Sequence, residues 1–435
     1  MLKRKDITDY SLLAIPLAFV GLPLYIHAPD FYVAQYGLSL STLAGILLAL
    51  RIFDAVQDPI IGALSDTYSK HRFEFMFVSL IFLALGFFAL FTPLVNHVAG
   101  WFVLSMLLAT TAFSILTVNL NALGALWSAE PEQQTRITTT REAMALIGLT
   151  IAVITPSLLQ QWLSPSSSFK WMSVILILFI IAGFWRFYGW YKRKKLSPTK
   201  PIKQRQSYWQ NIKKSSTSMR RFYAIYAVSM LASAMPAVLV LFFIRDRLGL
   251  EEYTGLFLLV YFASGIAAMP FWKSFSKNYS SECAWLISMI VAVISFIGAF
   301  LLNAGDFIPY LLICIASGFS LGSDLALPPA ILAKLMHQDK THKIASSQFA
   351  LLTFISKTAL AFAGIITLPI LDTMGFVAAT SNSTKALFGL SLTYALIPCI
   401  IKLIAALMLW HTMNQGETNE ENNLNRNHNR SEHSA

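Results

Sequence analysis

The sequence predicts an all-α integral membrane protein with twelve transmembrane helices in two six-helix halves. Three observations predict this fold class: an apolar composition, twelve long apolar stretches, and one basic segment that separates the first six stretches from the last six. Of the 435 residues, 56% are hydrophobic and 13% are charged, whereas about 25% of the residues in a soluble domain are charged. The polar residues are too few to cover a water-facing surface, which excludes a soluble enzyme and a disordered protein.

The apolar stretches are long enough to be spans, because a membrane helix needs roughly 20 mostly apolar residues to cross a ~30 Å hydrocarbon core. The first one is too long to be the apolar core of a cleaved secretory signal, so we interpret it as the first helix. The twelve predicted spans lie at approximately residues 10–35, 40–65, 74–95, 100–127, 137–161, 169–191, 222–245, 252–272, 283–303, 307–333, 344–371 and 385–411.

The basic segment sets the expected domain organisation. Residues 192–221 contain eleven Lys and Arg and no acid, which equals the net charge of +11 of the whole chain. We expect this segment to be a solvated cytoplasmic linker between an N-terminal half at 1–191 and a C-terminal half at 222–411. Residues 412–435 contain seven Asn and no apolar run, and we expect them to form a disordered cytoplasmic tail.

The distribution of Lys and Arg predicts the orientation. With the N-terminus inside, the loops and termini on the cytoplasmic side contain 25 of these residues and those on the opposite side contain four. The positive-inside rule therefore places both termini in the cytoplasm, and we expect a plasma membrane, the bacterial inner membrane. The local basic charge belongs to the linker, so nucleic acid is not an expected partner.

Several functional classes lack the residues that they need. No phosphate-binding loop of the form G-x-x-x-x-G-K-[ST] occurs, and no hydrophilic stretch is long enough for a nucleotide-binding domain, which excludes ATP as the energy source. The three cysteines lie inside spans and far apart in sequence, and the eight histidines are scattered, so we expect neither a zinc site nor an enzyme. A monomer without a cofactor is expected, with a small solute and the bilayer as its partners.

The second span contains charges where charges are costly. Arg51, Asp54 and Asp58 are spaced i, i+3, i+7 and share one helical face, with Gln57 beside them. A charge at mid-membrane costs at least ~2.5–3.5 kcal/mol and indicates a functional site. Two carboxylates one turn apart need a cation, a proton or a basic partner. We expect Arg51 to supply one partner and Na⁺ or H⁺ the other, the alternative being a static Arg–Asp pair that holds the helices together.

Two further charges lie in the second half. Lys357 is in the middle of the eleventh span with no acid within a turn of it, so its partner must come from another helix, and we expect the Asp54/Asp58 face. Asp324 lies in the tenth span, which is interrupted by two Gly and two Pro, a pattern typical of cavity-lining helices in transporters. A buried, hydrogen-bonded acid is the alternative for Asp324. Lys402 has no evident partner in the sequence.

Polar residues on two other spans are candidates for contact with a solute. Ser114, Asn119 and Asn121 form a polar face on the fourth span, and Tyr25 and His27 lie toward the outer half of the first. Asn and Ser also hold membrane helices together by hydrogen bonds, so helix packing remains an alternative for these residues.

The second span and the loop after it carry a resemblance to a known family. The stretch RIFDAVQDPIIGALSDTYSKHR, residues 51–72, resembles the signature of the glycoside–pentoside–hexuronide:cation symporters of the major facilitator superfamily. The stretches NALGALWSAEPEQQTRITTTRE and SSQFALLTFISKTALAFAG are similar to two further segments of that family. The resemblance spans both halves in matching order, and it implies the major facilitator fold and cation-coupled transport by alternating access.

The resemblance also implies roles for individual residues. Asp54 and Asp58 would bind the coupling cation with Gln57 and Ser114 nearby, and Lys357 would link the cation site to the solute site. Arg141 matches an Arg implicated at the family's sugar site. Gly62, Asp66 and Arg72 match the superfamily's loop motif, in which Asp66 near a helix end would form a cytoplasmic charge latch with a gating role.

The departures from the family concern the sugar. The family's best-known sugar carrier holds its sugar with an Asp on the first helix and another on the fourth, whereas residues 11–29 and 101–128 contain no acid. Cation coupling is therefore better supported than a sugar substrate. We predict a symporter coupled to Na⁺ or H⁺ that carries a small polar solute, a sugar or a related compound. A carrier of a lipid or amphipathic solute is the alternative, and a membrane sensor that does not transport is a remote one.

Overall fold

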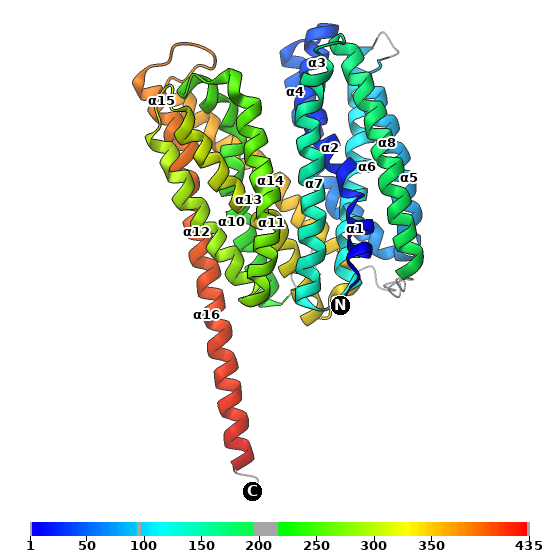
Figure 1. Ribbon diagram of the computed structural model, residues 1–435, viewed down its shortest axis with the longest axis vertical. Coiled ribbons are helices and arrows are strands. Elements are labelled where there is room, and N and C mark those ends of the chain that lie inside the picture. The colour runs from blue at the N-terminus through cyan, green and yellow to red at the C-terminus, as the bar shows by residue number, and fades with distance from the viewer. Residues whose placement is uncertain (1, 94–96, 195–215, 433–435) are drawn as a thin grey trace.

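The computed structural model describes residues 2–93, 97–194 and 216–432, and in these ranges the regular structure is helical. Figure 1 shows two helical bundles side by side, one built from α1–α8 and one from α10–α16. The N-terminal bundle consists of α1 Arg4–Ser11, α2 Ala14–Leu22, η1 Pro23–His27, α3 Ala28–Tyr36, α4 Leu40–Thr67, η2 Ser69–His71, α5 Arg72–Leu90, α6 Val98–Trp127, α7 Pro131–Leu159 and α8 Pro165–Lys194.

The C-terminal bundle follows after residue 215. Most of the predicted linker, residues 195–215, lies outside the described residues, and the domain boundaries remain predictions. This bundle consists of α10 Thr217–Phe242, η3 Phe243–Arg247, η4 Glu251–Tyr253, α11 Thr254–Asn278, α12 Ser281–Ile297, η5 Gly298–Leu301, α13 Phe307–Gln338, η6 His342–Ile344, α14 Ala345–Thr373, α15 Thr384–Ser391, η7 Leu392–Leu396 and α16 Ile397–Glu432.

Each predicted span corresponds to a helix or a run of helices. Within the described ranges, eleven segments are long and apolar enough to cross a membrane. The predicted span at 40–65 is α4, a helix of 28 residues that is not among the eleven and that contains Arg51, Asp54 and Asp58.

Two predicted segments differ from the structure, the first span in its interior and the tail in its conformation. The first span is not one helix, because the chain turns at Leu12–Leu13 and a π-helical turn begins at Pro23, where the missing backbone N–H interrupts regular hydrogen bonding. The expected tail at 412–435 begins inside α16, which continues to Glu432 and extends beyond the bundle in Figure 1. The stretch contains Gly416 but no Pro, so no residue in it forbids a helix.

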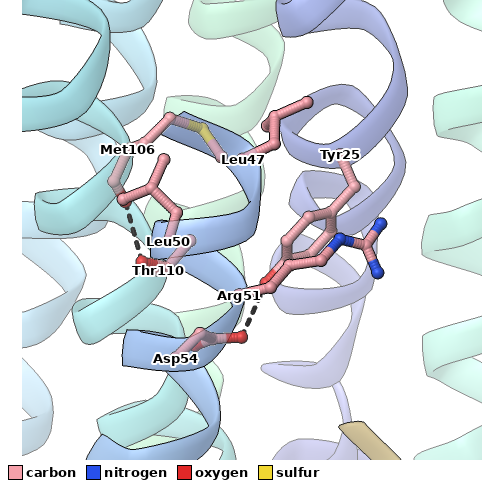
Figure 2. Close-up of a pocket in the computed structure, with 7 residues that line it drawn as sticks. All are labelled: Tyr25, Leu47, Leu50, Arg51, Asp54, Met106 and Thr110. Atoms are coloured by element: carbon pink, nitrogen blue, oxygen red, sulfur yellow. Dashed lines mark hydrogen bonds between the residues drawn. The ribbon is translucent and has the colours of Figure 1, made fainter. Parts of the chain in front are cut away.

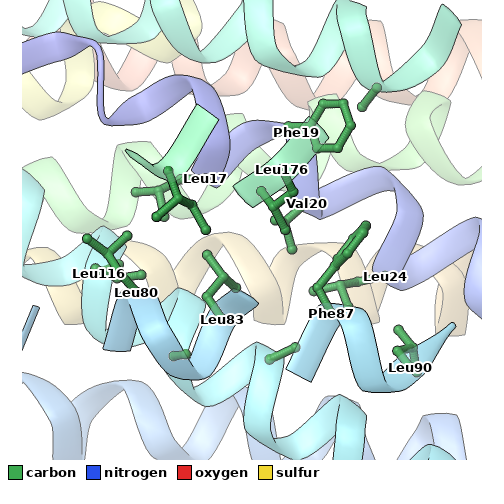
Figure 3. Packing of buried hydrophobic residues seen from close by; sticks show 14 of the residues in the cluster. Leu17, Phe19, Val20, Leu24, Leu80, Leu83, Phe87, Leu90, Leu116 and Leu176 are labelled. Carbon is green, nitrogen blue, oxygen red and sulfur yellow. The ribbon is translucent and has the colours of Figure 1, made fainter. Parts of the chain in front are cut away.

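The core of the N-terminal bundle is apolar and closely packed. Figure 3 shows Leu17 and Val20 of α2 facing Leu83 and Phe87 of α5. Helices α2 and α7 approach closely at Gly148, because a Cβ there would lie 2.2 Å from the carbonyl oxygen of Ile15. Small residues allow such approaches between membrane helices.

The two bundles meet along a defined set of helices. Helices α4 and α6 of the first half pack against α14 of the second, and α7 packs against α11 and α13. The predicted cation site at Asp54 and Asp58 lies on this interface. Below, the end of the molecule where α8 stops and α10 starts is called the linker end, and it is the end expected to face the cytoplasm.

Candidate cation and gating sites

The charged face of α4 is paired with a lysine from the other half. The Lys357 ammonium on α14 lies 2.8 Å from Oδ1 of Asp54, 2.9 Å from Oδ2 of Asp58 and 2.9 Å from Oγ of Ser114 on α6. Asp58 and Ser114 are fully buried. Oxygens from two helices therefore surround one cationic group at the interface between the halves.

Neighbouring polar groups hold the Asp54 carboxylate in place. The amide Nε2 of Gln57 donates to its Oδ1 at 2.8 Å, and the hydroxyl of Tyr25 donates to its Oδ2 at 3.1 Å. Thr111 in turn donates to Oε1 of Gln57 at 2.8 Å. The oxygen of Gln57 is thus engaged by Thr111, and its amide nitrogen faces Asp54. In this conformation Gln57 therefore orients the carboxylate through its amide N–H. Its carbonyl oxygen is engaged by Thr111 and is not offered as a ligand to a cation.

Tyr25 reaches Asp54 because of the irregular first span. It lies in the π-helical turn η1, Pro23–His27, and such turns are frequent at functional sites. Figure 2 shows Tyr25 and Asp54 lining one small pocket with Arg51 and Thr110. The pocket lies toward the start of α4, away from the linker end, and its remaining walls are apolar: Leu47, Leu50 and Met106.

Arg51 does not pair with the carboxylates as the spacing predicted. It is exposed, and no ion pair involves it in the part of the chain that the structure describes. Figure 2 shows its guanidinium directed away from Asp54. Lys357 and Tyr25 already occupy the Asp54 oxygens, so the neutralising partner of the acidic face is Lys357 in this structure.

The other predicted cavity residues are distributed among separate sites. Arg141 is buried on α7 and forms an ion pair with Glu142 at 2.6 Å. Asn119 donates to Oγ of Ser65 at 2.9 Å and so joins α6 to α4, which is the packing role left open above. Asn121 is half-buried on α6, and the ring of His27 packs against Phe169, with ring centroids 5.8 Å apart. None of these contacts joins them to the Asp54–Lys357 site.

A second buried charge pair lies inside the C-terminal half. Lys402 on α16 forms an ion pair with Oδ2 of Asp324 on α13, and its ammonium also donates to Ser229 and Ser233 on α10 at 2.9 and 3.0 Å. Trp285 on α12 donates its indole N–H to Oδ1 of Asp324 at 3.1 Å. Four helices therefore converge on one network in which both Asp324 oxygens and the ammonium are hydrogen-bonded.

The sequence alone does not identify the partner of Lys402. Its acid is 78 residues away on another helix, and no local spacing connects them. One feature of the sequence does point to the pair: Lys402 and Asp324 are each an isolated charge inside an apolar span, and such charges are expected to pair within the bundle.

The loop motif after α4 joins the halves at the linker end. Both oxygens of Asp66 accept backbone N–H groups in the first turn of α14, from Ser346 at 2.9 Å and from Ser347 at 2.7 Å. Arg72 lies 3.2 Å from Asp66 and also donates to Oγ of Ser346 at 2.8 Å. The first turn of a helix has free N–H groups and a positive dipole end, which bind a carboxylate well.

Close packing accompanies these bonds. A Cβ on Gly62 would lie 2.6 Å from Cβ of Ala350 and 2.9 Å from the carbonyl oxygen of Ser346, so only glycine fits against α14 there. A further cross-half hydrogen bond at this end joins Thr135 of α7 to Ser281 of α12 at 3.1 Å. The linker end is therefore closed by contacts between the halves.

Comparison with known proteins gives the family. Residues 10–413 match the model of a family described as MFS/sugar transport protein, where MFS is the major facilitator superfamily. The chain belongs to this family. It is thus a multi-pass membrane transporter of the major facilitator superfamily and not an enzyme.

Curated relatives in this family are distant in sequence. The chain is 23% identical over 400 residues to the uncharacterized symporter YnaJ of Bacillus subtilis strain 168, covering 87% of this chain and 84% of the relative. It is 21% identical over 400 residues to the uncharacterized symporter YjmB of the same organism, covering 88% and 86%. Along most of its length, this chain is thus similar to proteins named as symporters.

Solved structures confirm the fold. A bacterial homologue of the iron transporter ferroportin in an outward-facing state aligns with a TM-score of 0.67 at 14% identity, covering 93% of this chain and all of that one. The Escherichia coli fucose:proton symporter FucP aligns with a TM-score of 0.65 at 12% identity, covering 92% and 97%. At these identities the likeness shows the major facilitator fold alone.

Proposed function

We propose that this transporter is a symporter that couples uptake of a small polar solute, a sugar or a related compound, to Na⁺ or H⁺. One observation carries the proposal: the Lys357 ammonium lies within 3 Å of an oxygen of each of Asp54, Asp58 and Ser114. The lysine occupies the place that a small cation would take among these oxygens. The family description and the names of the relatives support the same activity.

The geometry suggests how a cation acts. Na⁺ among the carboxylates, or a proton on one of them, removes the charge that attracts Lys357. Because Lys357 belongs to the C-terminal half and both acids to the N-terminal half, this exchange weakens a contact between the halves. A cation shifts the equilibrium toward the arrangement of the halves that it binds more tightly. This difference in affinity is the physical requirement for coupling. The hydroxyl of Ser114 and the backbone oxygen of Asp54 are further oxygens at hand for Na⁺.

The gate at the linker end belongs to the same cycle. Asp66 and Arg72 hold the first turn of α14 while the pocket beside Tyr25 and Arg51 lies on the opposite side of the cation site. We propose that this arrangement is the one in which the site is approached from outside. The placement in a bacterial inner membrane with both termini in the cytoplasm, and a monomeric state, are part of the proposal.

The decisive experiment is gradient-driven uptake in proteoliposomes with Asp58→Asn. We expect at least a hundredfold loss of uptake under an imposed Na⁺ or H⁺ gradient, with the protein still present in the membrane. Asp372→Asn is the matched control, because this exposed acid lies at the far end of α14. Uptake at the normal rate by Asp58→Asn would refute the assignment. Competition by sugars rather than by amphipathic compounds would separate the proposed cargo from the lipid alternative.

A further inference from the structure

A groove on the outside of the N-terminal half is separate from the sites described above. It lies between the turn that joins α1 to α2 and the linker-end half of α8. On α8 its lining residues are spaced i, i+3, i+4, i+7, so they form one face of the helix. The groove is lined by Leu12, Ile15, Phe179, Ala182, Gly183 and Arg186.

The groove has one charged residue, at its linker end. The side chain of Arg186 is 52% exposed, although it lies within a predicted span. Its Nε lies 2.8 Å from Oδ1 of Asp9, and its two terminal nitrogens have no hydrogen-bond partner among the residues described. The neighbouring Trp185 is 75% exposed, and exposed Trp residues are typical of the level where a bilayer meets water. Arg186 therefore presents free donors at the level of lipid headgroups.

More basic residues follow at the end of the same helix. Arg193 and Lys194 share Asp6 and Asp9 with Arg186, so three cations face two carboxylates. Lys192 adds a charge above the ring of Tyr188. At ~1.5 Å per residue, Lys194 lies about 12 Å beyond Arg186 along α8. The cluster has a net positive charge, and the apolar groove begins where the cluster ends.

From this arrangement we propose that the groove binds an anionic phospholipid. The phosphate group accepts hydrogen bonds from the terminal nitrogens of Arg186, since a guanidinium binds phosphate oxygens in a two-pronged fashion. One acyl chain lies along Phe179, Ala182 and Gly183 between the two helices. The surplus positive charge of the cluster selects an anionic headgroup over a zwitterionic one. This site is independent of the transport proposal, because neither Arg186 nor the groove contacts the Asp54–Lys357 site.

The test is lipid retention by the purified full chain, measured by native mass spectrometry. Detergent-solubilised protein is titrated with phosphatidylglycerol and, separately, with phosphatidylethanolamine. We expect about one tightly retained phosphatidylglycerol and at least tenfold weaker retention of phosphatidylethanolamine. Arg186→Gln should weaken phosphatidylglycerol binding at least tenfold. Asp9 is not left unpaired in this variant, because it keeps Arg193 as its partner at 2.5 Å. Lys170→Gln is the matched control, an exposed cation at the other end of α8.

A second variant tests the groove without changing any charge. Ala182 is exposed, so Ala182→Trp fills the groove from outside and should also weaken retention of phosphatidylglycerol. Normal retention by both Arg186→Gln and Ala182→Trp would overturn the proposal, as would equal retention of the two lipids by the unmodified protein.

Discussion

Neutralising Lys402 and Asp324 one at a time should damage the protein more than neutralising both. Lys402 is 5% exposed, and its ammonium is held by Asp324, Ser229 and Ser233. In Lys402→Met, the Asp324 carboxylate keeps only the neutral donors Ser233 and Trp285. In Asp324→Asn, the ammonium keeps only the two serine hydroxyls. Each single change therefore leaves one uncompensated charge among four packed helices.

The expected magnitude follows from the burial of the pair. Removing one partner of a buried ion pair costs about 3–5 kcal/mol, whereas replacing the whole pair by neutral groups of similar size is often nearly neutral. If the two sites were independent, the double variant would lose about 6–10 kcal/mol. With coupling, Lys402→Met/Asp324→Asn should be more stable than either single variant.

The assay is thermal unfolding of purified protein in detergent, followed by tryptophan fluorescence. Because unfolding of membrane proteins in detergent is commonly irreversible, the order of the midpoints at one scan rate is the readout. Lys385→Met, which removes an exposed lysine, is the control and should leave the midpoint unchanged. A double variant that unfolds at a lower temperature than both single variants would show that the network in the structure is not an interdependent charge pair.

The remaining predictions concern the cation site and the gate. Ser114→Ala should raise the half-saturating cation concentration for uptake about five- to tenfold, the equivalent of one lost hydrogen-bonding oxygen. The control is Ser105→Ala, which changes a buried serine on the same helix and should leave this concentration unchanged. Equal half-saturating concentrations for the two variants would count against the site. Gly62→Ala should slow uptake at least fivefold, because its Cβ collides with Ala350 at the closed gate and overpacking costs about 1–3 kcal/mol. Gly45→Ala, with open space around its Cβ on the same helix, is the control, and normal uptake by Gly62→Ala would contradict the gating role.

Local spacing placed Asp54 and Asp58 on one helical face, and this part of the site agrees with the structure. Asp54 and Asp58 face the same way because four residues make about one turn. The partner of Lys357 was inferred by a different argument: an isolated charge inside the bilayer needs an opposite charge from another helix. The structure brings this lysine to the predicted face.

Spacing alone did not predict which neighbour occupies each oxygen. Arg51 has the right spacing to reach Asp54, but its side chain is directed away, and Lys357 and Tyr25 contact the carboxylate from other helices. Tyr25 reaches the site through a π-helical turn, and no hydropathy pattern distinguishes such a turn from a regular helix. The partner of Lys402 depends on how α13 and α16 are placed around α10, which is a property of the whole bundle.

Helices α4 and α14 run antiparallel and are joined at two levels, at Asp66 beside the first turn of α14 and at Lys357 in mid-membrane. Lys357 lies ten positions after Ser347 on α14, about 15 Å along the helix. If each contact stabilises the same closed arrangement, the two are thermodynamically linked. A change that loosens the gate then alters cation affinity at a distance, by the same factor by which the cation alters the closure of the gate. Under the proposed function, this pair of helices would then connect ion occupancy mechanically to access.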